Sequence, residues 1–238
     1  MGTIFQTDLF DFKWVKRKPV ARSKTCSRTG SHTAVSAPAK VMVVLHGRGD
    51  SLEAFREIQN ELEMPEMNFL LLNAPRKFED GFSWYRSEPN HAESVVEVRA
   101  QLFELVRQLN NAGFSSENIF WMGHSQGCLI ACDLVLNHPA RFGGLIGVSG
   151  YLWFFRGWKK KLVDSGAYGT PWLITHGTHD RVIRPREIRE DIAALVASDV
   201  PVLYREFRKG HDFDFTVEVP FIRDWLKTRT LEPTTLHS

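Results

Sequence analysis

The sequence contains few cysteines, little net charge and no long hydrophobic run. Its three cysteines, Cys26, Cys128 and Cys132, are an odd number in a chain of 238 residues. Two of them lie four residues apart in an apolar segment, which suits buried helix positions better than a disulfide framework and favours a reducing compartment. The formal net charge is only +2, so the chain as a whole has no strong electrostatic attraction for nucleic acid or membranes.

Targeting signals are also lacking. The opening residues, MGTIFQTDLFDF, contain no basic region followed by an apolar core, so we expect no signal peptide. Myristoylation of Gly2 is not expected, because Gln6 stands where the motif requires serine or threonine. No apolar run approaches the length of a membrane span. We therefore expect a cytoplasmic protein with no stable membrane insertion.

The basic residues are concentrated near the N-terminus. Between Asp11 and Asp50 there is no acidic residue, whereas nine residues are lysine or arginine. Residues 17–39 are also rich in serine, threonine and proline, and we interpret them as a basic loop or hairpin insert. Charge runs usually need no partner, so we expect a solvated loop and no nucleic-acid binding. Contact of Lys13–Arg28 with nucleic acid or with an anionic membrane surface is the alternative.

From Lys40 onward, short apolar runs alternate with segments of helical spacing. The runs are VMVVLH, NFLLLNAP, NIFWMG, GGLIGVSG, TPWLITHG and VPVLYREF, and DLFDFKWVKRK before them alternates like an exposed edge strand. The predicted helices are SLEAFREIQNEL, AESVVEVRAQLFELVRQLNNAG, SQGCLIACDLVLNHP, PREIREDIAALVAS and TVEVPFIRDWLKT. This alternation predicts one α/β domain over residues 1–238, with a mostly parallel central sheet covered by helices on both faces.

The stretch WMGHSQGCLI places Ser125 between Gly123 and Gly127 in a G-x-S-x-G pattern. A strand is expected before it and a helix after it, which is the context that a nucleophile elbow requires. Side chains two residues before or after the serine would collide with neighbouring elements, and glycine avoids this. We predict that Ser125 is a nucleophile. The alternative is a chance match in a glycine-containing turn.

A serine nucleophile needs a general base, which is usually a histidine oriented by a carboxylate. His211 follows the sixth apolar run and Asp180 follows the fifth, so both are expected at the carboxyl edge of the sheet. The chain order Ser125, Asp180, His211 is the order of α/β-hydrolases. We expect His124, beside the nucleophile, to pack under the elbow.

An oxyanion hole requires two backbone N–H groups that point at the developing negative charge. The residue after the nucleophile, Gln126, is expected to supply one of them. The loop LHGRGDS follows the first apolar run, and its glycines let the backbone approach closely. Arg48 stands where the second donor is expected. A simple turn is the alternative interpretation of this loop.

Five motifs, LHGRGD, APRKFEDGFSWY, GHSQGC, HGTHDRVI and GHDF, together resemble the phospholipase/carboxylesterase group of α/β-hydrolases, which includes the acyl-protein thioesterases. The resemblance runs from about Val41 to the last helix. It implies a cytosolic serine esterase or thioesterase that uses no cofactor, with the triad and oxyanion hole named above. It also implies that Trp84 and Tyr85 lie near the substrate groove. Cys128 in the elbow and the basic insert depart from the pattern of that group.

The segment GYLWFFRGWKKKL, after the fourth apolar run, is also unusual for that group. Within residues 150–168 we consider an aromatic lid or acyl-chain groove, which would make Trp153 and Phe154 substrate-binding residues. A short buried helix with a solvated basic end is an equal alternative. Contact with a lipid surface is a third, because aromatic residues and lysines together suit interfaces.

The predicted function is a serine hydrolase that cleaves a small-molecule carboxylic ester or thioester through an acyl-enzyme. We expect no cofactor, and no metal, because the cysteine and histidine spacings match no zinc site. A homodimer is compatible with the sequence. The alternatives are an amide or peptide hydrolase with the same triad and a non-catalytic binding module of the same fold.

Overall fold

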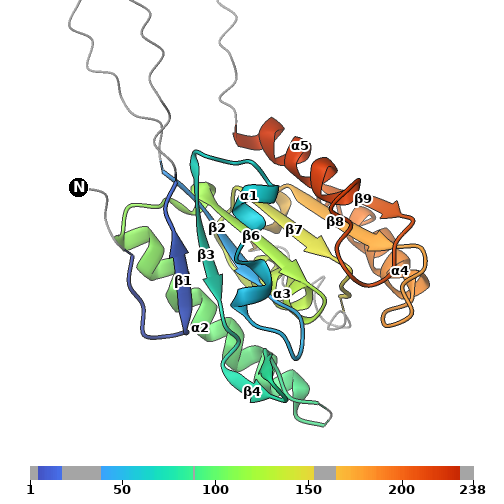
Figure 1. Cartoon of the computed structure of the whole chain (residues 1–238), viewed down its shortest axis with the longest axis horizontal. Helices are drawn as coiled ribbons and strands as arrows, with labels where there is room; N and C mark the ends of the chain where they lie inside the picture. Colours follow the sequence, from blue (N-terminus) through green and yellow to red (C-terminus); the bar gives the residue numbers. More distant parts are fainter. Residues whose placement is uncertain (1–4, 18–38, 88, 153–164, 231–238) are drawn as a thin grey trace, which may run out of the picture.

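The protein, seen here as a computed structural model, is described over residues 5–17, 39–87, 89–152 and 165–230. A sheet of seven strands forms its centre, in the order β1-β3-β2-β6-β7-β8-β9 (Figure 1). The strands are β1 (Phe12–Val15), β2 (Lys40–Leu45), β3 (Met67–Leu72), β6 (Ile119–His124), β7 (Gly144–Val148), β8 (Trp172–Gly177) and β9 (Val202–Phe207). All neighbours are parallel except β1, which pairs antiparallel with β3 at the edge. The predicted parallel sheet and its exposed edge strand are confirmed.

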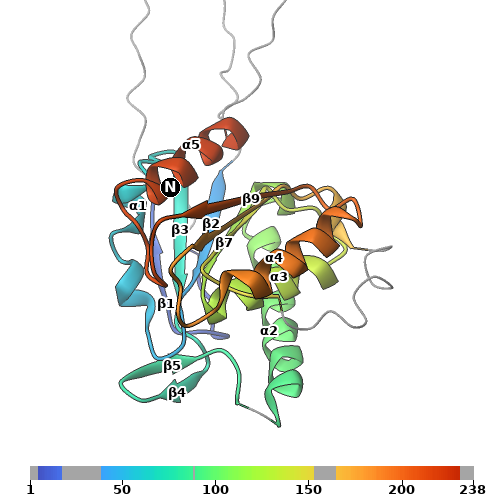
Figure 2. The ribbon, with the colours of Figure 1, turned by 90° about the vertical axis from the view of Figure 1, so that its right-hand side faces the viewer.

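Helices cover both faces of this sheet, as predicted (Figure 2). One face carries α2 (His91–Asn111), α3 (Gln126–Asn137) and α4 (Pro185–Val196). The other carries the 3-10 turn η1 (Leu52–Phe55), α1 (Ile58–Glu61) and α5 (Glu218–Thr230). Because side chains alternate along a strand, β2 sends Val41, Val43 and Leu45 to the first layer and Met42 and Val44 to the second. The runs that form β2, β3, β7 and β8 are therefore buried on both sides, whereas β9 is partly exposed, with Leu203 at 45%.

The segment SLEAFREIQNEL differs from the predicted continuous helix. It forms the 3-10 turn η1 and then the short helix α1. Its buried residues Leu52, Phe55 and Ile58 recur every three positions, a spacing that suits a 3-10 turn, in which side chains at i and i+3 are eclipsed. The side chain of Asn73 fixes the start of this turn, because its Oδ1 accepts from the Leu52 N–H at 2.8 Å.

A small hairpin that the sequence analysis missed lies beside the loop after β2. It consists of β4 (Arg76–Phe78) and β5 (Gly81–Ser83). The Gly49 N–H donates to the Phe82 carbonyl at 2.8 Å, and the Phe82 N–H donates to the Asp50 carbonyl at 2.9 Å. A Cβ at Gly81 would lie 2.3 Å from the Gly49 carbonyl oxygen, so only glycine allows this approach. The hairpin is thereby fixed against the loop that contains Arg48.

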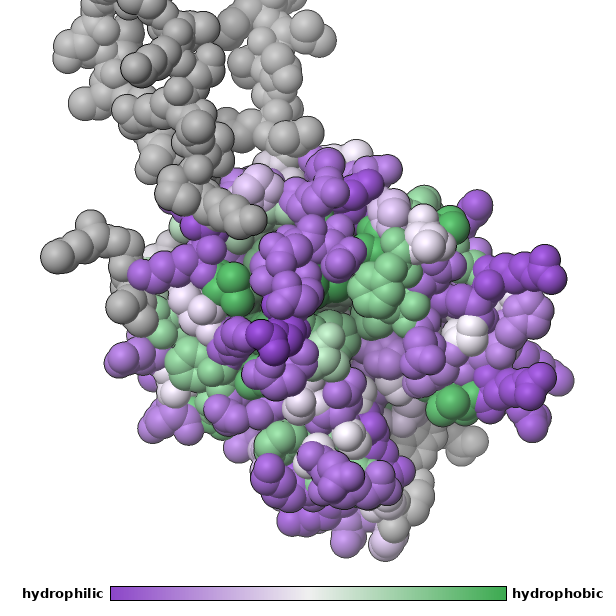
Figure 3. Space-filling model, viewed as in Figure 1, coloured by the Kyte–Doolittle hydropathy of each residue, from purple (hydrophilic) through white to green (hydrophobic). Residues whose placement is uncertain are grey.

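The face seen in Figure 1 is mostly polar, with hydrophobic residues in small separate groups (Figure 3). Among the described helices, none combines the length and the apolar character needed to cross a membrane. The cytoplasmic location and the homodimer stay predictions. Most of the basic insert predicted over residues 17–39 and much of the lid segment predicted within 150–168 fall on residues 18–38 and 153–164, which lie outside the described residues.

Candidate active site

Ser125 occupies a tight turn between β6 and α3. Its backbone has φ 52° and ψ −114°, a conformation that costs a non-glycine residue about 1–3 kcal/mol. The Ser125 N–H donates to the Val148 carbonyl at 2.9 Å, which ties the turn to β7. A Cβ at Gly123 would lie 2.3 Å from the Gly127 carbonyl oxygen, and a Cβ at Gly127 would lie 2.3 Å from the Leu45 carbonyl oxygen. Both glycines are therefore required for the close packing expected of the motif.

Ser125, His211 and Asp180 meet at the carboxyl edge of the sheet. His211 Nε2 is 2.9 Å from Ser125 Oγ, and His211 Nδ1 is 2.8 Å from Asp180 Oδ2. An ionised carboxylate can only accept hydrogen bonds, so His211 Nδ1 carries the proton. Its Nε2 is then free to accept the proton of the serine hydroxyl. Residues 125, 180 and 211 thus form one continuous chain of hydrogen bonds.

Asp180 is held in its ionised form. Its side chain is buried, and Oδ1 accepts from the backbone N–H groups of Val182 at 2.8 Å and Ile183 at 2.9 Å. Burial alone would raise the pKa of this carboxyl, but the hydrogen bonds from His211, Ile183 and Val182 outweigh it and lower the pKa below its ordinary value. His176 Nε2 donates to the Ile183 carbonyl at 2.9 Å and so supports the same turn.

The loop that carries His211 is anchored by side chains on neighbouring elements. His124 donates from Nε2 to the His211 carbonyl oxygen at 3.0 Å, so it packs beneath the elbow as expected. Burial lowers the pKa of His124 to about 4, which keeps its imidazole neutral. The ammonium group of Lys209 contacts the Asp212 carbonyl at 3.0 Å and forms a buried ion pair with Glu218 Oε2 at 2.9 Å. This pair was not predicted from the sequence.

The two residues predicted to supply the oxyanion hole, Arg48 and Gln126, line the same cavity as Ser125. Gln126 begins α3, and the first N–H groups of a helix have no partner within it. In the described part of the chain, no hydrogen bond occupies the Arg48 N–H, whereas its neighbours Gly49 and Asp50 both donate. A Cβ at Gly47 would lie 3.4 Å from Ser125 Cβ. The loop backbone therefore runs directly beside the serine side chain.

The side chain of Gln126 connects the elbow to the β4–β5 hairpin. Its Oε1 accepts from the Trp84 N–H at 2.8 Å, and its Nε2 donates to Ser83 Oγ at 3.1 Å. The Trp84 indole donates to the His46 carbonyl at 2.8 Å. Since the Ala74 N–H donates to His46 Nε2, the His46 proton resides on Nδ1 and is donated to the Gly47 carbonyl at 2.6 Å. These buried bonds fix the two loops around Ser125.

A cavity of about 750 Å³ opens above Ser125 and His211. Tyr85 lines it, together with Tyr151, which the sequence analysis did not single out. Trp84, which was predicted to lie near the substrate groove, is 0% exposed and is not among the described lining residues. The other two predicted substrate-binding residues, 153 and 154, lie outside the described residues. Among the described residues, the lining consists of Arg48, Tyr85, Arg86, Ser87, His91, Ser125, Gln126, Tyr151, Val182, Ile183, Glu187 and His211.

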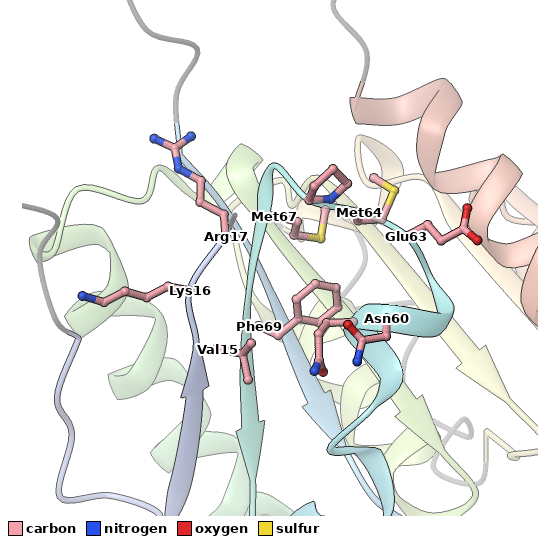
Figure 4. Close-up of a pocket in the computed structure, with 10 residues that line it drawn as sticks. Val15, Lys16, Arg17, Asn60, Glu63, Met64, Met67 and Phe69 are labelled. Atoms are coloured by element: carbon pink, nitrogen blue, oxygen red, sulfur yellow. The ribbon is translucent and has the colours of Figure 1, made fainter. Parts of the chain in front are cut away.

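A second cavity, of about 390 Å³, lies at the opposite edge of the sheet (Figure 4). Val15 and Arg17 border it from β1 and the residues after it, and Met67 and Phe69 border it from β3. Because Met67 begins β3, this is the amino edge of the parallel strands, where ligands of open α/β sheets do not usually bind. This second cavity is not lined by Ser125, Asp180 or His211.

In the described ranges, no group of histidine, cysteine and carboxylate side chains could hold a metal ion.

The sheet order, the serine elbow and the Ser–His–Asp arrangement at the carboxyl edge define an α/β-hydrolase fold. Residues 32–228 match the phospholipase/carboxylesterase family, and the chain belongs to that family. It is 26% identical over 175 residues to acyl-protein thioesterase 1 of Yarrowia lipolytica, covering 64% of this chain and 77% of the relative. It is also 26% identical over 136 residues to a probable inactive carboxylesterase of Oryza sativa, covering 57% and 55%.

Solved structures agree with this assignment of the fold. SOBER1 of Arabidopsis thaliana superimposes with a TM-score of 0.73 at 25% identity, over 80% of this chain and 98% of the other. Acyl-protein thioesterase 2 of Zea mays has a TM-score of 0.72 at 20% identity, over 92% and 99%. Membership in this family supports an ester or thioester hydrolase.

Proposed function

We propose that this protein is a cofactor-free serine hydrolase that cleaves carboxylic esters or thioesters through a covalent acyl-enzyme. One observation carries the proposal: His211 bridges Ser125 Oγ at 2.9 Å and Asp180 Oδ2 at 2.8 Å, at the base of a cavity of about 750 Å³. This is the spacing that a nucleophile, a general base and an orienting carboxylate need. The two backbone N–H groups beside Ser125 add the donors that acyl transfer requires.

The acylation step follows from these positions. His211 Nε2 accepts the hydroxyl proton of Ser125 while Oγ attacks the carbonyl carbon of the substrate. The negative oxygen of the tetrahedral intermediate accepts from the N–H groups of Arg48 and Gln126. The imidazolium of His211, stabilised by the ionised Asp180, then donates its proton to the leaving alcohol or thiol. The carbon–oxygen or carbon–sulfur bond breaks, and the acyl group stays on Ser125.

Deacylation repeats these steps with water. His211 Nε2 removes a proton from a water molecule, whose oxygen attacks the acyl carbon. The N–H groups of Arg48 and Gln126 again bind the oxyanion. When the intermediate collapses, the proton on His211 returns to Ser125 Oγ and the carboxylic acid leaves.

Labelling with a fluorophosphonate probe tests this proposal. We expect covalent labelling of Ser125 and its complete loss in Ser125→Ala. Hydrolysis of 4-nitrophenyl butyrate is expected to fall in parallel, and any comparable hydrolysis by Ser125→Ala would contradict the mechanism. A non-catalytic binding module, the alternative that the inactive rice relative raises, would show neither labelling nor turnover. Matched series of esters, thioesters and anilides of increasing acyl length would then define the substrate and test the amide alternative.

A further inference from the structure

Among the described residues that line the cavity above Ser125, the positively charged side chains and the negatively charged one belong to segments on opposite sides of the serine. We propose that the cavity selects substrates with an anionic group, a carboxylate or phosphate, near the scissile bond, and that Arg48 and Arg86 bind this group. The inference rests on the proposed function and deepens it by naming a class of substrate.

Arg48 and Arg86 come from segments on the same side of Ser125. Arg48 is in the loop after β2, and Arg86 follows the β4–β5 hairpin that is hydrogen-bonded to that loop. In the sheet, β2 is the neighbour of β6 on one side, whereas β7 and β8 follow on the other side. Glu187, the carboxylate of the lining, lies beyond β8 in α4. Among the described lining residues, the two arginines thus lie toward β2 and the glutamate toward β8, with the serine between.

The Arg48 side chain is held in place by a hydrogen bond and an aromatic contact. Its Nη2 donates to Ser87 Oγ at 3.3 Å, and its Cζ lies 4.1 Å from the centre of the Phe78 ring. Among the described residues, neither Arg48 nor Arg86 forms an ion pair. A guanidinium has five N–H donors in a planar fork that matches a carboxylate or phosphate. Both side chains therefore have donors available to a substrate anion.

A pair of tyrosines supplies a further donor beside Arg48. The hydroxyl groups of Tyr85 and Tyr151 are hydrogen-bonded to each other, and both residues line the cavity. One hydroxyl donates to the other, so the accepting hydroxyl keeps its own proton for a ligand. Burial raises the pKa of both phenols, and both groups lie close enough to feel the charge of Arg48. Both phenols stay protonated at neutral pH, and the accepting hydroxyl can donate to the same anion as the guanidinium.

Two esters of equal chain length test the proposal. Mono-4-nitrophenyl glutarate carries a carboxylate at the end of its acyl chain, whereas 4-nitrophenyl pentanoate ends in a methyl group. We expect the ratio of their kcat/KM values to favour the glutarate. Arg48→Gln and Arg86→Gln should each lower this ratio about tenfold, because each removes a charge-assisted hydrogen bond. Glu187→Gln should raise the ratio, since it removes a repulsive charge.

Arg181→Gln is the matched control, because Arg181 is exposed and near the cavity but outside its lining. Its ratio should equal that of the wild type. If the wild type shows no preference and the Arg48 and Arg86 variants leave the ratio unchanged, the anion site is wrong while Ser125-dependent turnover still supports the proposed function. If neither ester is hydrolysed, the proposed function fails, and calorimetry with Ser125→Ala tests the anion site independently. Tighter binding of the glutarate ester supports the site, and equal affinities overturn it.

Discussion

Replacing Lys209 by methionine tests how the loop that carries His211 is held. The ammonium group of Lys209 lies 2.9 Å from Glu218 Oε2, 2.8 Å from Ser149 Oγ and 3.0 Å from the Asp212 carbonyl oxygen. The two charged side chains are only 5% and 0% exposed. This ion pair therefore connects α5 and the end of β7 to the residue that follows the catalytic imidazole.

Removing one partner of a buried ion pair costs about 3–5 kcal/mol, because the remaining charge is left without compensation. We expect Lys209→Met to lower the free energy of unfolding by about this amount, which is a large share of the roughly 5–15 kcal/mol of an ordinary domain. The turnover number should also fall about 100-fold, since a shift of His211 by about 1 Å is enough to disturb catalysis. Replacing Glu218 by methionine as well removes the stranded carboxylate, so the double variant should regain most of the stability but not the turnover.

Urea unfolding followed by tryptophan fluorescence measures the first effect, and kcat with 4-nitrophenyl butyrate measures the second. Arg186→Met is the control, because Arg186 and Glu190 form an ion pair whose side chains are 88% and 69% exposed, and such pairs contribute little. The reasoning is refuted if Lys209→Met unfolds at the same urea concentration as Arg186→Met and keeps the wild-type kcat. A double variant less stable than Lys209→Met would refute the assignment of the cost to the stranded carboxylate.

Three further predictions concern the elbow and the triad. Gly127→Ala should strongly destabilise the fold or prevent folding, because its Cβ would lie 2.3 Å from the Leu45 carbonyl oxygen. Gly210→Ala is the control: its Cβ meets no atom within 4 Å, so this variant should unfold at the same urea concentration as the wild type. Asp180→Asn should lower kcat on 4-nitrophenyl butyrate about 10⁴-fold, because the amide can donate to His211 Nδ1 and so favour the tautomer with its proton on Nε2, which cannot accept the serine proton. A variant that keeps the kcat of the wild type would contradict the triad. Burial lowers the pKa of His124 from 6.5 to about 4. Between pH 6.5 and pH 4 the unfolded chain therefore binds a proton at His124 that the folded chain does not bind. The free energy of unfolding should fall by up to about 3 kcal/mol as the pH drops through this range. Urea unfolding at pH 7 and pH 5 should show a smaller loss for His124→Gln than for the wild type, and equal losses would exclude this contribution.

The sequence was sufficient for features that depend on local patterns. Continuous apolar runs predicted the strands of the parallel sheet, because a strand buried on both faces has no polar side. Gly123 and Gly127 predicted the elbow, because only a close backbone approach requires glycine two residues to either side of Ser125. Asp180 and His211 follow successive strands, and the carboxyl ends of parallel strands meet at one edge, so the topology alone brings them near the serine.

Features that depend on long-range packing could not be predicted in this way. Lys209 and Glu218 look like solvated charges in the sequence, because nothing local shows that both are buried in one site. Trp84 looks like a groove residue, but its aromatic ring fills space beneath the loop after β2, which only the folded chain reveals. The hairpin of β4 and β5 was missed because its strands have three residues each and gain their order from contacts with a distant loop.

The distribution of the triad over the sheet has a consequence for how activity is gained during folding. The nucleophile follows β6, the carboxylate follows β8 and the imidazole follows β9, so the groups come from separate crossover units with β7 inserted between the first two. No fragment that ends before residue 211 can contain the complete set. Recovery of esterase turnover during refolding should therefore coincide with docking of the last strand, which makes enzymatic activity a direct reporter of complete assembly.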